Sequence, residues 1–289
     1  MMSAMMLILS RRPMNERGKH LCLFSGIGGF TIGAEAAGWE TIAFAECDPF
    51  AQKILGRHWP NKILFSDVRE VARDLCEIPR CETCEDYFCD LCEAHFFECN
   101  CMTTDGIYDR FGQIDLISAG WPCQDVSRMG KGAGLAGPRS GLWDEVRRIV
   151  EQIRPAFALV ENSANVLAGD RGRWFGRICG DLAGIGYDLE WRVFRSDFFG
   201  VRQKRERVFL LAYDSRRIRS KPHKRALLPT EISAAPFERC QPEPFRVRIP
   251  HGPPDGVDIG KRISSCSNAI VPSIAYNILK NLPLVNSDE

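Results

Sequence analysis

A cysteine directly after an apolar run is the first residue of this sequence whose type and position suggest chemistry. Residues 116–125 read LISAGWPCQD, so Cys123 follows an apolar segment and a Gly-Trp-Pro turn. A thiol held at a fixed place on a loop can act as a nucleophile once it loses its proton. Free cysteine is also among the most buried residue types, so this stretch alone favours a structural thiol.

Residues that could activate such a thiol stand beside two later apolar runs. Glu161 follows the run at 157–160, while Arg205 and Arg207 stand just before the last such run. Guanidinium groups favour a nearby thiolate and also bind phosphate. If these segments meet at one edge of a sheet, a thiol, a carboxyl group and two arginines face one crevice. This combination favours a nucleophilic Cys123 over a structural one.

A glycine-rich turn comes near the start of the chain and is followed by two acidic residues. The segment LCLFSGIGGF places Gly26, Gly28 and Gly29 between a predicted strand and a predicted helix. Glycine permits a tight turn and close approach of a ligand to the backbone. Glu46 and Asp67 end or follow the next two predicted strands, where a carboxylate can accept hydrogen bonds from ribose hydroxyls. The pattern indicates an adenosine-containing cofactor, and the lack of a following Gly-Lys-Ser/Thr is evidence against a nucleoside triphosphate.

The elements that must position these residues alternate along the chain. The predicted strands are 21–24, 41–45, 62–65, 114–118, 157–160, 189–194 and 208–212. The predicted helices are 30–37, 50–57, 68–75, 142–153, 174–183 and a closing helix at 269–282. This alternation predicts an α/β fold with a doubly wound, mostly parallel sheet and helices on both faces. Ligands of such sheets bind outside the carboxyl ends of the strands, which is where the residues named above fall.

Composition and charge narrow the class of protein. The chain has 289 residues with a net charge of +1, and no apolar run is long enough to span a bilayer. We therefore predict a cytoplasmic protein with no membrane partner, and residues 1–18 are interpreted as a disordered leader in which Met14 could be the true start. Residues 192–225 are strongly basic and residues 67–105 strongly acidic. A basic stretch inside a fold suits a phosphate backbone, although two solvated faces would give the same pattern.

Five motifs, taken together, resemble those of the DNA (cytosine-5) methyltransferases, in particular the compact phage-encoded members. They are FSGIGG at 24–29, PCQ at 122–124, Glu-Asn at 161–162, QKRER at 203–207 and NAIVP at 268–272. The resemblance covers most of 19–212 and 261–282, and the family order of the motifs is kept. Three departures are Trp121 in place of a second proline, Ser163 in place of valine, and Ser267 in place of glycine.

The resemblance implies transfer of a methyl group from S-adenosylmethionine to carbon 5 of cytosine. Cys123 would attack C6 of a base flipped out of double-stranded DNA, and Glu161 would protonate or hydrogen-bond N3. Arg207 would bind O2 of the base and Arg205 a nearby phosphate. We expect the cofactor to contact Phe24, Gly26, Gly28, Glu46, Asp67, Pro122, Leu142 and Asn268.

The DNA is expected to lie against basic residues that flank this site. The expected contacts are Gln124, Arg128, Lys131, Arg216, Arg217 and Arg219, and the glycine-rich loop 127–139 is expected to close over the flipped base. Residues 214–262 form a short target-recognition region. Within it, Arg239, Arg246 and Arg248 are candidate readers of guanine, with ordinary solvated surface as the alternative.

Seven of the thirteen cysteines crowd between Cys76 and Cys101. Paired Cys-x-x-Cys motifs are typical of tetrahedral zinc, so we predict a structural zinc module at 76–105. The first-choice ligands are Cys81, Cys84, Cys89 and Cys92, while Cys76, His95, Cys99 and Cys101 are further candidates. Free thiols remain the alternative. Four other cysteines are expected to fill the core: Cys22, Cys47, Cys179 and Cys266.

The sequence therefore predicts a monomer with one catalytic domain, made of 19–75, 106–213 and 263–283, that is interrupted by the zinc module and the recognition region. Two other functions stay open. An RNA cytosine-5 methyltransferase of the same structural family would share the Pro-Cys-Gln motif, and the short recognition region is consistent with it. A catalytically silent nucleic-acid-binding protein is the third possibility, against which Cys123, Glu161 and Arg207 argue.

Overall fold

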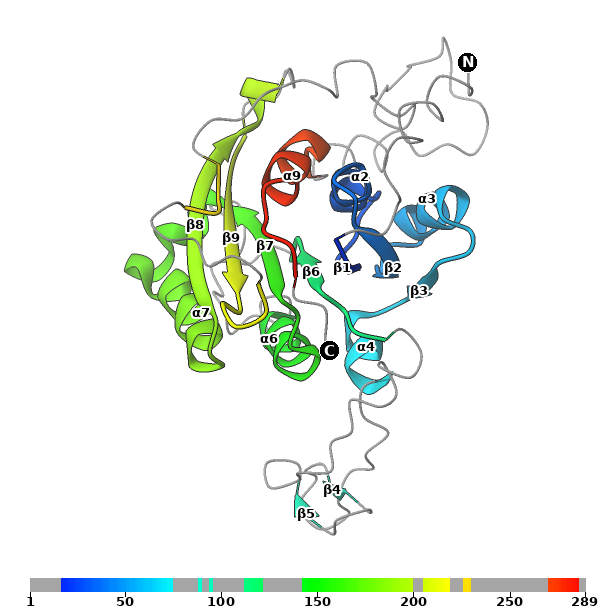
Figure 1. Ribbon diagram of the computed structural model, residues 1–289, viewed down its shortest axis with the longest axis horizontal. Helices are drawn as coiled ribbons and strands as arrows, with labels where there is room; N and C mark the ends of the chain where they lie inside the picture. The colour runs from blue at the N-terminus through cyan, green and yellow to red at the C-terminus, as the bar shows by residue number, and fades with distance from the viewer. Residues whose placement is uncertain are drawn as a thin grey trace.

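A computed structural model gives the fold of the chain. It describes residues 17–74, 88–89, 94–95, 112–121, 142–199, 205–218, 226–229 and 270–285. A seven-stranded sheet runs through the centre in the order β3-β2-β1-β6-β7-β9-β8 (Figure 1). The mixed α/β architecture and the seven predicted strands are confirmed.

The first half of the sheet alternates strands with helices. Its elements are β1 (Lys19–Leu23), α2 (Gly29–Ala36), β2 (Glu40–Ala45), α3 (Pro49–His58), β3 (Ile63–Phe65) and α4 (Val68–Asp74). These three strands are parallel, and β1 also pairs in parallel with β6 (Leu116–Ala119). Helix α3 begins at a proline, and the Asp48 side chain accepts a hydrogen bond from the backbone N–H of Phe50, as expected of an N-cap.

The second half ends in a hairpin. Its elements are α6 (Leu142–Ile153), β7 (Phe157–Ser163), η2 (Ala164–Leu167), η3 (Gly169–Gly172), α7 (Arg173–Gly184), β8 (Asp188–Arg195), η4 (Ser196–Phe199) and β9 (Glu206–Tyr213). Strand β9 runs antiparallel to both β7 and β8. The segment between β8 and β9 is too short for a crossover helix, so these strands can only pair antiparallel. As a result β9 begins where β7 ends, and Ser163 lies opposite Arg207.

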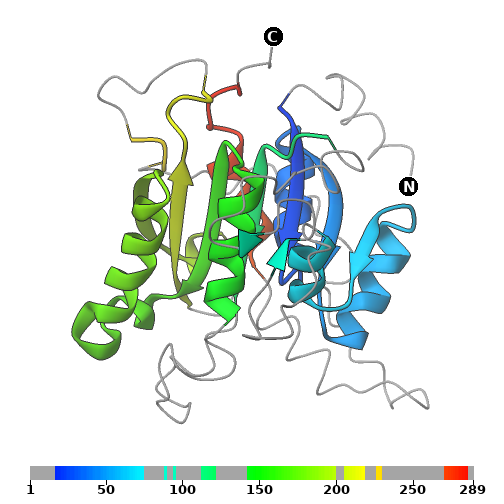
Figure 2. The same cartoon turned by 90° about the horizontal axis from the view of Figure 1, so that it is seen from below.

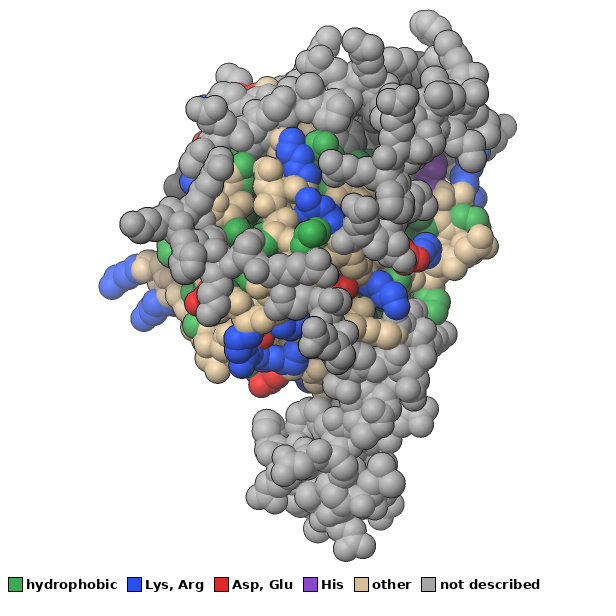
Figure 3. Space-filling model, viewed as in Figure 1, with side chains coloured by type: hydrophobic (Ala, Val, Ile, Leu, Met, Phe, Trp, Pro, Cys, Tyr) green, Lys and Arg blue, Asp and Glu red, His purple; other side chains and the backbone are tan. Residues whose placement is uncertain are grey.

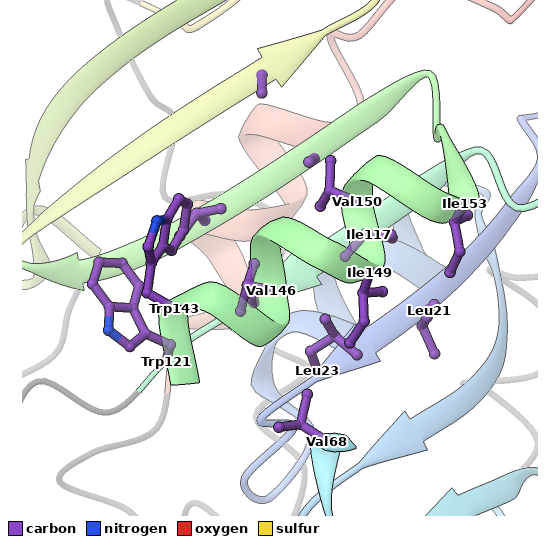
Figure 4. Packing of buried hydrophobic residues seen from close by; sticks show 14 of the residues in the cluster. Leu21, Leu23, Val68, Ile117, Trp121, Trp143, Val146, Ile149, Val150 and Ile153 are labelled. Carbon is purple, nitrogen blue, oxygen red and sulfur yellow. The ribbon is translucent and has the colours of Figure 1, made fainter. Parts of the chain in front are cut away.

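Side chains alternate between the two faces of the sheet and fill two cores. Leu21 and Leu23 of β1 face α4, α6 and α7, whereas Cys22 between them faces α2, α3 and α9 (Figure 2). Helix α6 presents a buried stripe at helical spacing, which is drawn in Figure 4: Trp143, Val146, Ile149, Val150 and Ile153. Each such side chain stabilises the fold by roughly 1.5–3 kcal/mol.

Helix α9 (Pro272–Leu279) closes the second core by packing on α2. A Cβ at Gly29 would lie 2.3 Å from the Ile270 carbonyl oxygen, and one at Gly33 would lie 2.6 Å from the Ala275 Cβ. Glycines one helical turn apart therefore let the two helices touch backbone to backbone. The helix is shorter than the predicted 269–282, because Pro272 occupies its first turn and a turn follows Leu279.

The guanidinium of Arg17 holds the end of α9. Its Nη1 donates to the carbonyl oxygens of Leu279 (3.2 Å) and Leu282 (2.8 Å), and its Nη2 donates to that of Lys280 (2.6 Å). A cation at the last carbonyls of a helix satisfies acceptors that have no partner within the helix. The start of the described chain is thereby fixed to its last helix.

Three further findings concern earlier expectations. Within the cysteine-rich segment, β4 (Phe88–Cys89) and β5 (Ala94–His95) pair as an antiparallel hairpin, which the sequence analysis does not anticipate. Cys22 is buried as predicted, but the prediction for Cys47 is wrong, because it lies exposed just beyond the end of β2. Among the described helices, none is both long and apolar enough to cross a bilayer.

Candidate active site

The predicted site residues gather at one edge of the sheet, where the parallel strands end. The glycine turn follows β1, Glu46 follows β2, Asp67 follows β3, and Glu161 lies near the end of β7. Arg205 and Arg207 join them because β9 runs the other way and begins at this edge. An all-parallel sheet would have placed these two arginines at the opposite edge.

The glycine turn has one side open and the other closed. Gly26 has a φ of +53°, and a Cβ built there would meet no atom within 4 Å. Gly28 has a φ of +92°, and a Cβ there would lie 2.7 Å from the Trp59 ring. Phe24, which precedes the turn, also adopts a left-handed φ of 51°. The turn therefore needs glycine for its backbone at both positions and leaves the Gly26 side accessible.

Glu46 links the glycine turn to the next strand end. Its Oε2 accepts the backbone N–H of Gly26 at 2.6 Å, and its Oε1 accepts that of Asp48 at 2.8 Å. Each carboxylate oxygen keeps a further lone pair that a ligand hydroxyl could use. The open Gly26 side and this oriented carboxylate fit the ribose of an adenosine-containing cofactor.

Two other expected cofactor residues have partners within the protein. Asp67 receives a two-pronged ion pair from Arg69, whose Nε lies 3.0 Å from Oδ1 and whose Nη2 lies 2.9 Å from Oδ2. A ligand amino group would have to share that carboxylate with Arg69 or displace it. Leu142 begins α6 and is partly buried against the core beneath it.

Glu161 is a buried acid at this edge. Burial raises the pKa of its carboxyl group, while the charges of Arg207 and Arg205 only partly offset that effect. The Arg207 Nε lies 2.9 Å from Glu161 Oε1. By distance this is an ion pair, yet the same Nε makes no hydrogen bond, so its N–H is not directed at the oxygen. This poor alignment explains why the arginine offsets burial only in part.

A small cavity with room for about one water molecule lies beside this pair. Its polar wall comes from Glu161, Ser196, Arg205 and Arg207, and its apolar wall from Phe209, Ile270, Val271 and Ile274. The backbone N–H of Arg205 donates to the Ser196 Oγ at 2.9 Å, which fixes the start of β9. A buried acid and two guanidinium groups thus border one small space.

Trp121, two residues before Cys123, is fixed by contacts with Asn162 and Trp143. The Asn162 Nδ2 donates to the Trp121 carbonyl oxygen at 3.2 Å, and the Trp121 ring lies 5.4 Å from that of Trp143 (Figure 4). Trp121, one of the departures from the family pattern, is therefore a buried anchor. Cys123 follows Trp121 by two residues in the sequence. Ser163, a second departure, caps η2 with its hydroxyl.

Several predicted site residues lie outside the described residues. They are Pro122, Cys123, Gln124, Arg128, Lys131, Arg219 and Asn268, together with Cys81, Cys84 and Cys92 of the expected zinc site. Arg239, Arg246, Arg248 and the loop 127–139 also lie outside them. Of the expected metal ligands, the first-choice Cys89 is the last residue of β4, and the further candidate His95 is the last residue of β5. Among the described residues, no group of His, Cys, Asp and Glu side chains could hold a metal ion.

Arg216 and Arg217, which are expected to contact the DNA, do not lie with Glu161. They follow β9 at the opposite edge of the sheet, and each pairs with a carboxylate there. The Arg216 Nη2 lies 2.7 Å from Asp214 Oδ2, and the Arg217 Nη2 lies 3.1 Å from Asp115 Oδ1. Figure 3 shows separate groups of Lys and Arg side chains on the face it views, some with Asp or Glu beside them.

Sequence reasoning misses Ile270 as a member of the site. Its side chain approaches Glu161 across Gly120, where a Cβ would lie 3.0 Å from the Ile270 Cδ1 and 3.6 Å from the Glu161 Oε2. Ile270 lies in the NAIVP motif at 268–272 and Gly120 directly follows an apolar strand, but neither signal places the Ile270 side chain beside Glu161. Which residue fills the space beside a glycine cannot be read from a single sequence.

These features combine a mixed α/β fold with a glycine turn and a buried acid beside two arginines at one edge of the sheet. The profile of the C-5 cytosine-specific DNA methylases matches residues 19–243. The chain belongs to this family.

Individual relatives agree with that assignment. The Type II methyltransferase M2.BsuMI of Bacillus subtilis (strain 168) is 31% identical over 198 residues, which cover 67% of this chain and 41% of the relative. M.HaeII, a Type II methyltransferase of Haemophilus aegyptius, is 28% identical over 195 residues, or 68% of this chain and 50% of the relative. The match thus spans at most about half the length of these two relatives. The S. pombe Dnmt2 methyltransferase structure is 19% identical, covers 68% of this chain and 51% of that chain, and has a TM-score of 0.46.

Proposed function

We propose that this protein transfers a methyl group from S-adenosylmethionine to carbon 5 of cytosine in double-stranded DNA. The observation that carries the proposal is Glu161, a buried acid with a raised pKa at the same sheet edge as the glycine turn. A carboxyl group whose pKa is raised holds its proton more readily and can donate it to a ring nitrogen. The family of the chain supplies the reaction for which such a donor is needed.

The reaction begins with the thiolate of Cys123 attacking C6 of a cytosine that has left the DNA stack. Glu161 donates to N3, so the ring can accept the electron pair and carbon 5 becomes nucleophilic. Arg207 holds O2 of the base, and Arg205 holds a neighbouring phosphate. After methylation a base removes the proton from carbon 5, and the bond to Cys123 breaks to restore the ring and the thiolate.

The bound cofactor supplies the methyl group as an electrophile. Glu46 would accept hydrogen bonds from the ribose hydroxyls, because its carboxylate is already oriented by Gly26 and Asp48. Phe24, Gly26 and Gly28 would line the methionine part, and Leu142 the face of the adenine. Asp67 would hold the adenine amino group in competition with Arg69. Pro122 and Asn268 stay predictions from the resemblance.

The DNA contacts are proposed for residues on the Glu161 edge. Gln124, Arg128, Lys131 and the loop 127–139 follow Cys123 closely in sequence, so they can reach DNA held there. Arg216 and Arg217 lie at the other edge beside carboxylate partners, and they stay predicted phosphate contacts away from the flipped base. Arg219 and the candidate guanine readers Arg239, Arg246 and Arg248 stay predictions, as do the cytoplasmic location and the monomeric state.

We also propose a structural zinc ion in the cysteine-rich segment. The residues Cys89-Asp-Leu-Cys92 begin at the last residue of β4 and lie in the sequence between β4 and β5. A Cys-x-x-Cys pair is typical of two ligands of a tetrahedral ion, and Cys81 and Cys84 are the proposed second pair. The zinc would stabilise the insertion and take no part in methyl transfer.

Transfer of a tritiated methyl group from S-adenosylmethionine tests the proposal and its rivals. Duplex DNA should be labelled and transfer RNA should not, whereas labelled RNA alone would favour the RNA methyltransferase. Cys123→Ser should abolish labelling but leave cofactor affinity within a few fold. If the wild-type protein binds DNA but labels neither DNA nor RNA, a catalytically silent binding protein is favoured.

A further inference from the structure

Ile270 touches two parts of the proposed site that are far apart in the sequence. Its backbone carbonyl oxygen packs against Gly29 at the glycine turn, only 2.3 Å from where a Cβ would stand. Its side chain reaches Gly120, beyond β6, where the Cδ1 lies 3.0 Å from the Cβ position. One residue therefore contacts both the turn proposed for the cofactor and the segment that leads to Cys123.

The Glu161 carboxyl group shares the space beside Gly120 with Ile270. The Oε2 of Glu161 lies 3.6 Å from the same Cβ position, so the ethyl end of Ile270 and the carboxyl group border one point. Gly120 has no left-handed φ that would demand glycine for backbone reasons. A Cβ there would make a tight contact with the end of the isoleucine side chain, which would have to shift by a few tenths of an ångström.

Ile270 also forms part of the wall of the cavity beside Glu161. Together with Val271, Ile274 and Phe209 it supplies the apolar side, opposite Arg205, Arg207 and Ser196. The charged groups that face Glu161 within the described chain are therefore Arg207 and Arg205, and both act to keep the acid ionised. Burial acts in the other direction, and Ile270 is the apolar side chain that Gly120 brings against this acid.

We infer that Ile270 is a positioning residue through which the glycine turn controls the hydration of the Glu161 carboxyl group. The inference rests on the proposed function for the roles of the turn and of Glu161. A ligand that draws the turn inward carries the backbone of Ile270 with it, because that backbone lies against Gly29 without a gap. The side chain then moves relative to Glu161, and the amount of water at the carboxyl group changes. Cofactor binding and the state of the acid are thereby linked.

Titration of Glu161 by carbon-13 NMR tests this link without requiring catalysis. The protein is labelled at glutamate side chains, and the Glu161 signal is assigned from its loss in Glu161→Gln. In the wild type we expect the titration midpoint to change when S-adenosylhomocysteine, the product of the cofactor, is added. Ile270→Ala should admit water, move the midpoint of the free protein to lower pH, and remove most of its response to the ligand.

Two further variants keep the result interpretable. Ile270→Val retains most of the side chain and should titrate between the wild type and Ile270→Ala. Ile278→Ala deletes a fully buried side chain from α9 away from the cavity, so it should lower stability without moving the Glu161 midpoint.

The two proposals fail in distinguishable ways. If S-adenosylhomocysteine does not bind the wild type, the proposed cofactor is wrong. If it binds, and Ile270→Ala titrates as the wild type does with and without ligand, the role of Ile270 is refuted. An equal change of the Glu161 midpoint in Ile278→Ala would also refute the role of Ile270, because any destabilisation of α9 would then produce the change.

Discussion

The Nε of Arg207 lies 2.9 Å from the Oε1 of Glu161, yet it is not hydrogen-bonded to that oxygen. A well-aligned guanidinium would hold the carboxylate ionised. Here the contact is close but poorly directed, and burial raises the pKa of Glu161 despite the cation beside it. Glu161 can thus carry a proton while the positively charged guanidinium of Arg207 lies beside it.

Arg207→Gln should move the loss of activity at high pH to higher pH. The arginine lowers the pKa of Glu161, so without it the acid keeps its proton further up the pH scale. The maximal rate should fall at the same time, because the proposed contact to the base is lost. Rates of methyl transfer measured across pH show both effects. Arg205→Gln is the matched control, and it should shift the pH at which activity is lost by a smaller amount. If that pH does not change in Arg207→Gln, Arg207 does not lower the pKa of Glu161.

Glu46→Ala should weaken cofactor binding by about 1–3 kcal/mol, the cost of leaving buried polar groups without partners. The change removes the proposed acceptor for the ribose hydroxyls and also the partner of the Gly26 and Asp48 N–H groups. Calorimetric titration with S-adenosylhomocysteine measures the loss. Glu70→Ala, which removes an exposed contact to Ser66 near the same edge, should bind as the wild type does. Equal affinities for both variants would exclude Glu46 from the site.

Gly33→Ala should destabilise the protein by about 1–3 kcal/mol, as expected when a side chain is forced into a packed contact. Its Cβ would stand 2.6 Å from the Ala275 Cβ and 2.7 Å from the Pro272 carbonyl oxygen, so α9 would have to move. Gly56→Ala in α3 is the control. A Cβ there meets nothing within 4 Å, so it should gain up to about 1 kcal/mol from helix propensity. Urea unfolding measures the free energy of unfolding of both variants. Equal changes in the two variants would mean that α2 and α9 do not pack closely.

Acid should destabilise the fold through His20. This ring is fully buried between the Thr41 and Ser118 hydroxyls, and burial lowers its pKa from 6.5 to about 3. The unfolded chain therefore binds a proton below pH 6.5 that the folded chain binds only near pH 3. Stability is lost as pH falls between these values, by about 2 kcal/mol at pH 5.

Unfolding free energies of the wild type and of His20→Asn at pH 7 and pH 5 measure this contribution. The asparagine cannot titrate, so the variant should lose less stability between the two pH values. The absolute stability of the variant does not matter to the test, because only the difference between the two pH values is compared. Equal losses in both proteins would show that His20 does not supply the acid sensitivity.

Zinc bound to the cysteine-rich segment should be present in protein purified without added metal. Elemental analysis should find about one zinc per chain, as expected for one tetrahedral site. Removing it with a chelator should lower the melting temperature before it changes the rate of methyl transfer, because the module is proposed to be structural. Cys89→Ser should reduce the metal content, whereas Cys47→Ser, at an exposed thiol outside the segment, should not. Well under one zinc in the wild type would exclude the site.

Local patterns in the sequence predict much of this fold. The glycine turn and Glu46 are predicted correctly as neighbours, because each follows a parallel strand and such strands end at one edge. What local patterns miss depends on contacts between distant segments. Arg217 finds its carboxylate at Asp115, a hundred residues away, and nothing in the basic run from 192 to 225 signals that pairing. Ile270 meets Gly120 and Glu161 for the same reason, across three separate elements.

The packing of α9 on α2 sets an order of events during synthesis of the chain. Glu161 and Arg207 leave the ribosome long before residues 270–279, which cover Gly29 and Gly33. A nascent chain that stops short of α9 would contain the acid and its arginine, but the helix after the glycine turn would lack its covering layer. The protein is therefore expected to become competent to bind its cofactor only after α9 has emerged. An unfinished chain would be unable to carry out the proposed methyl transfer.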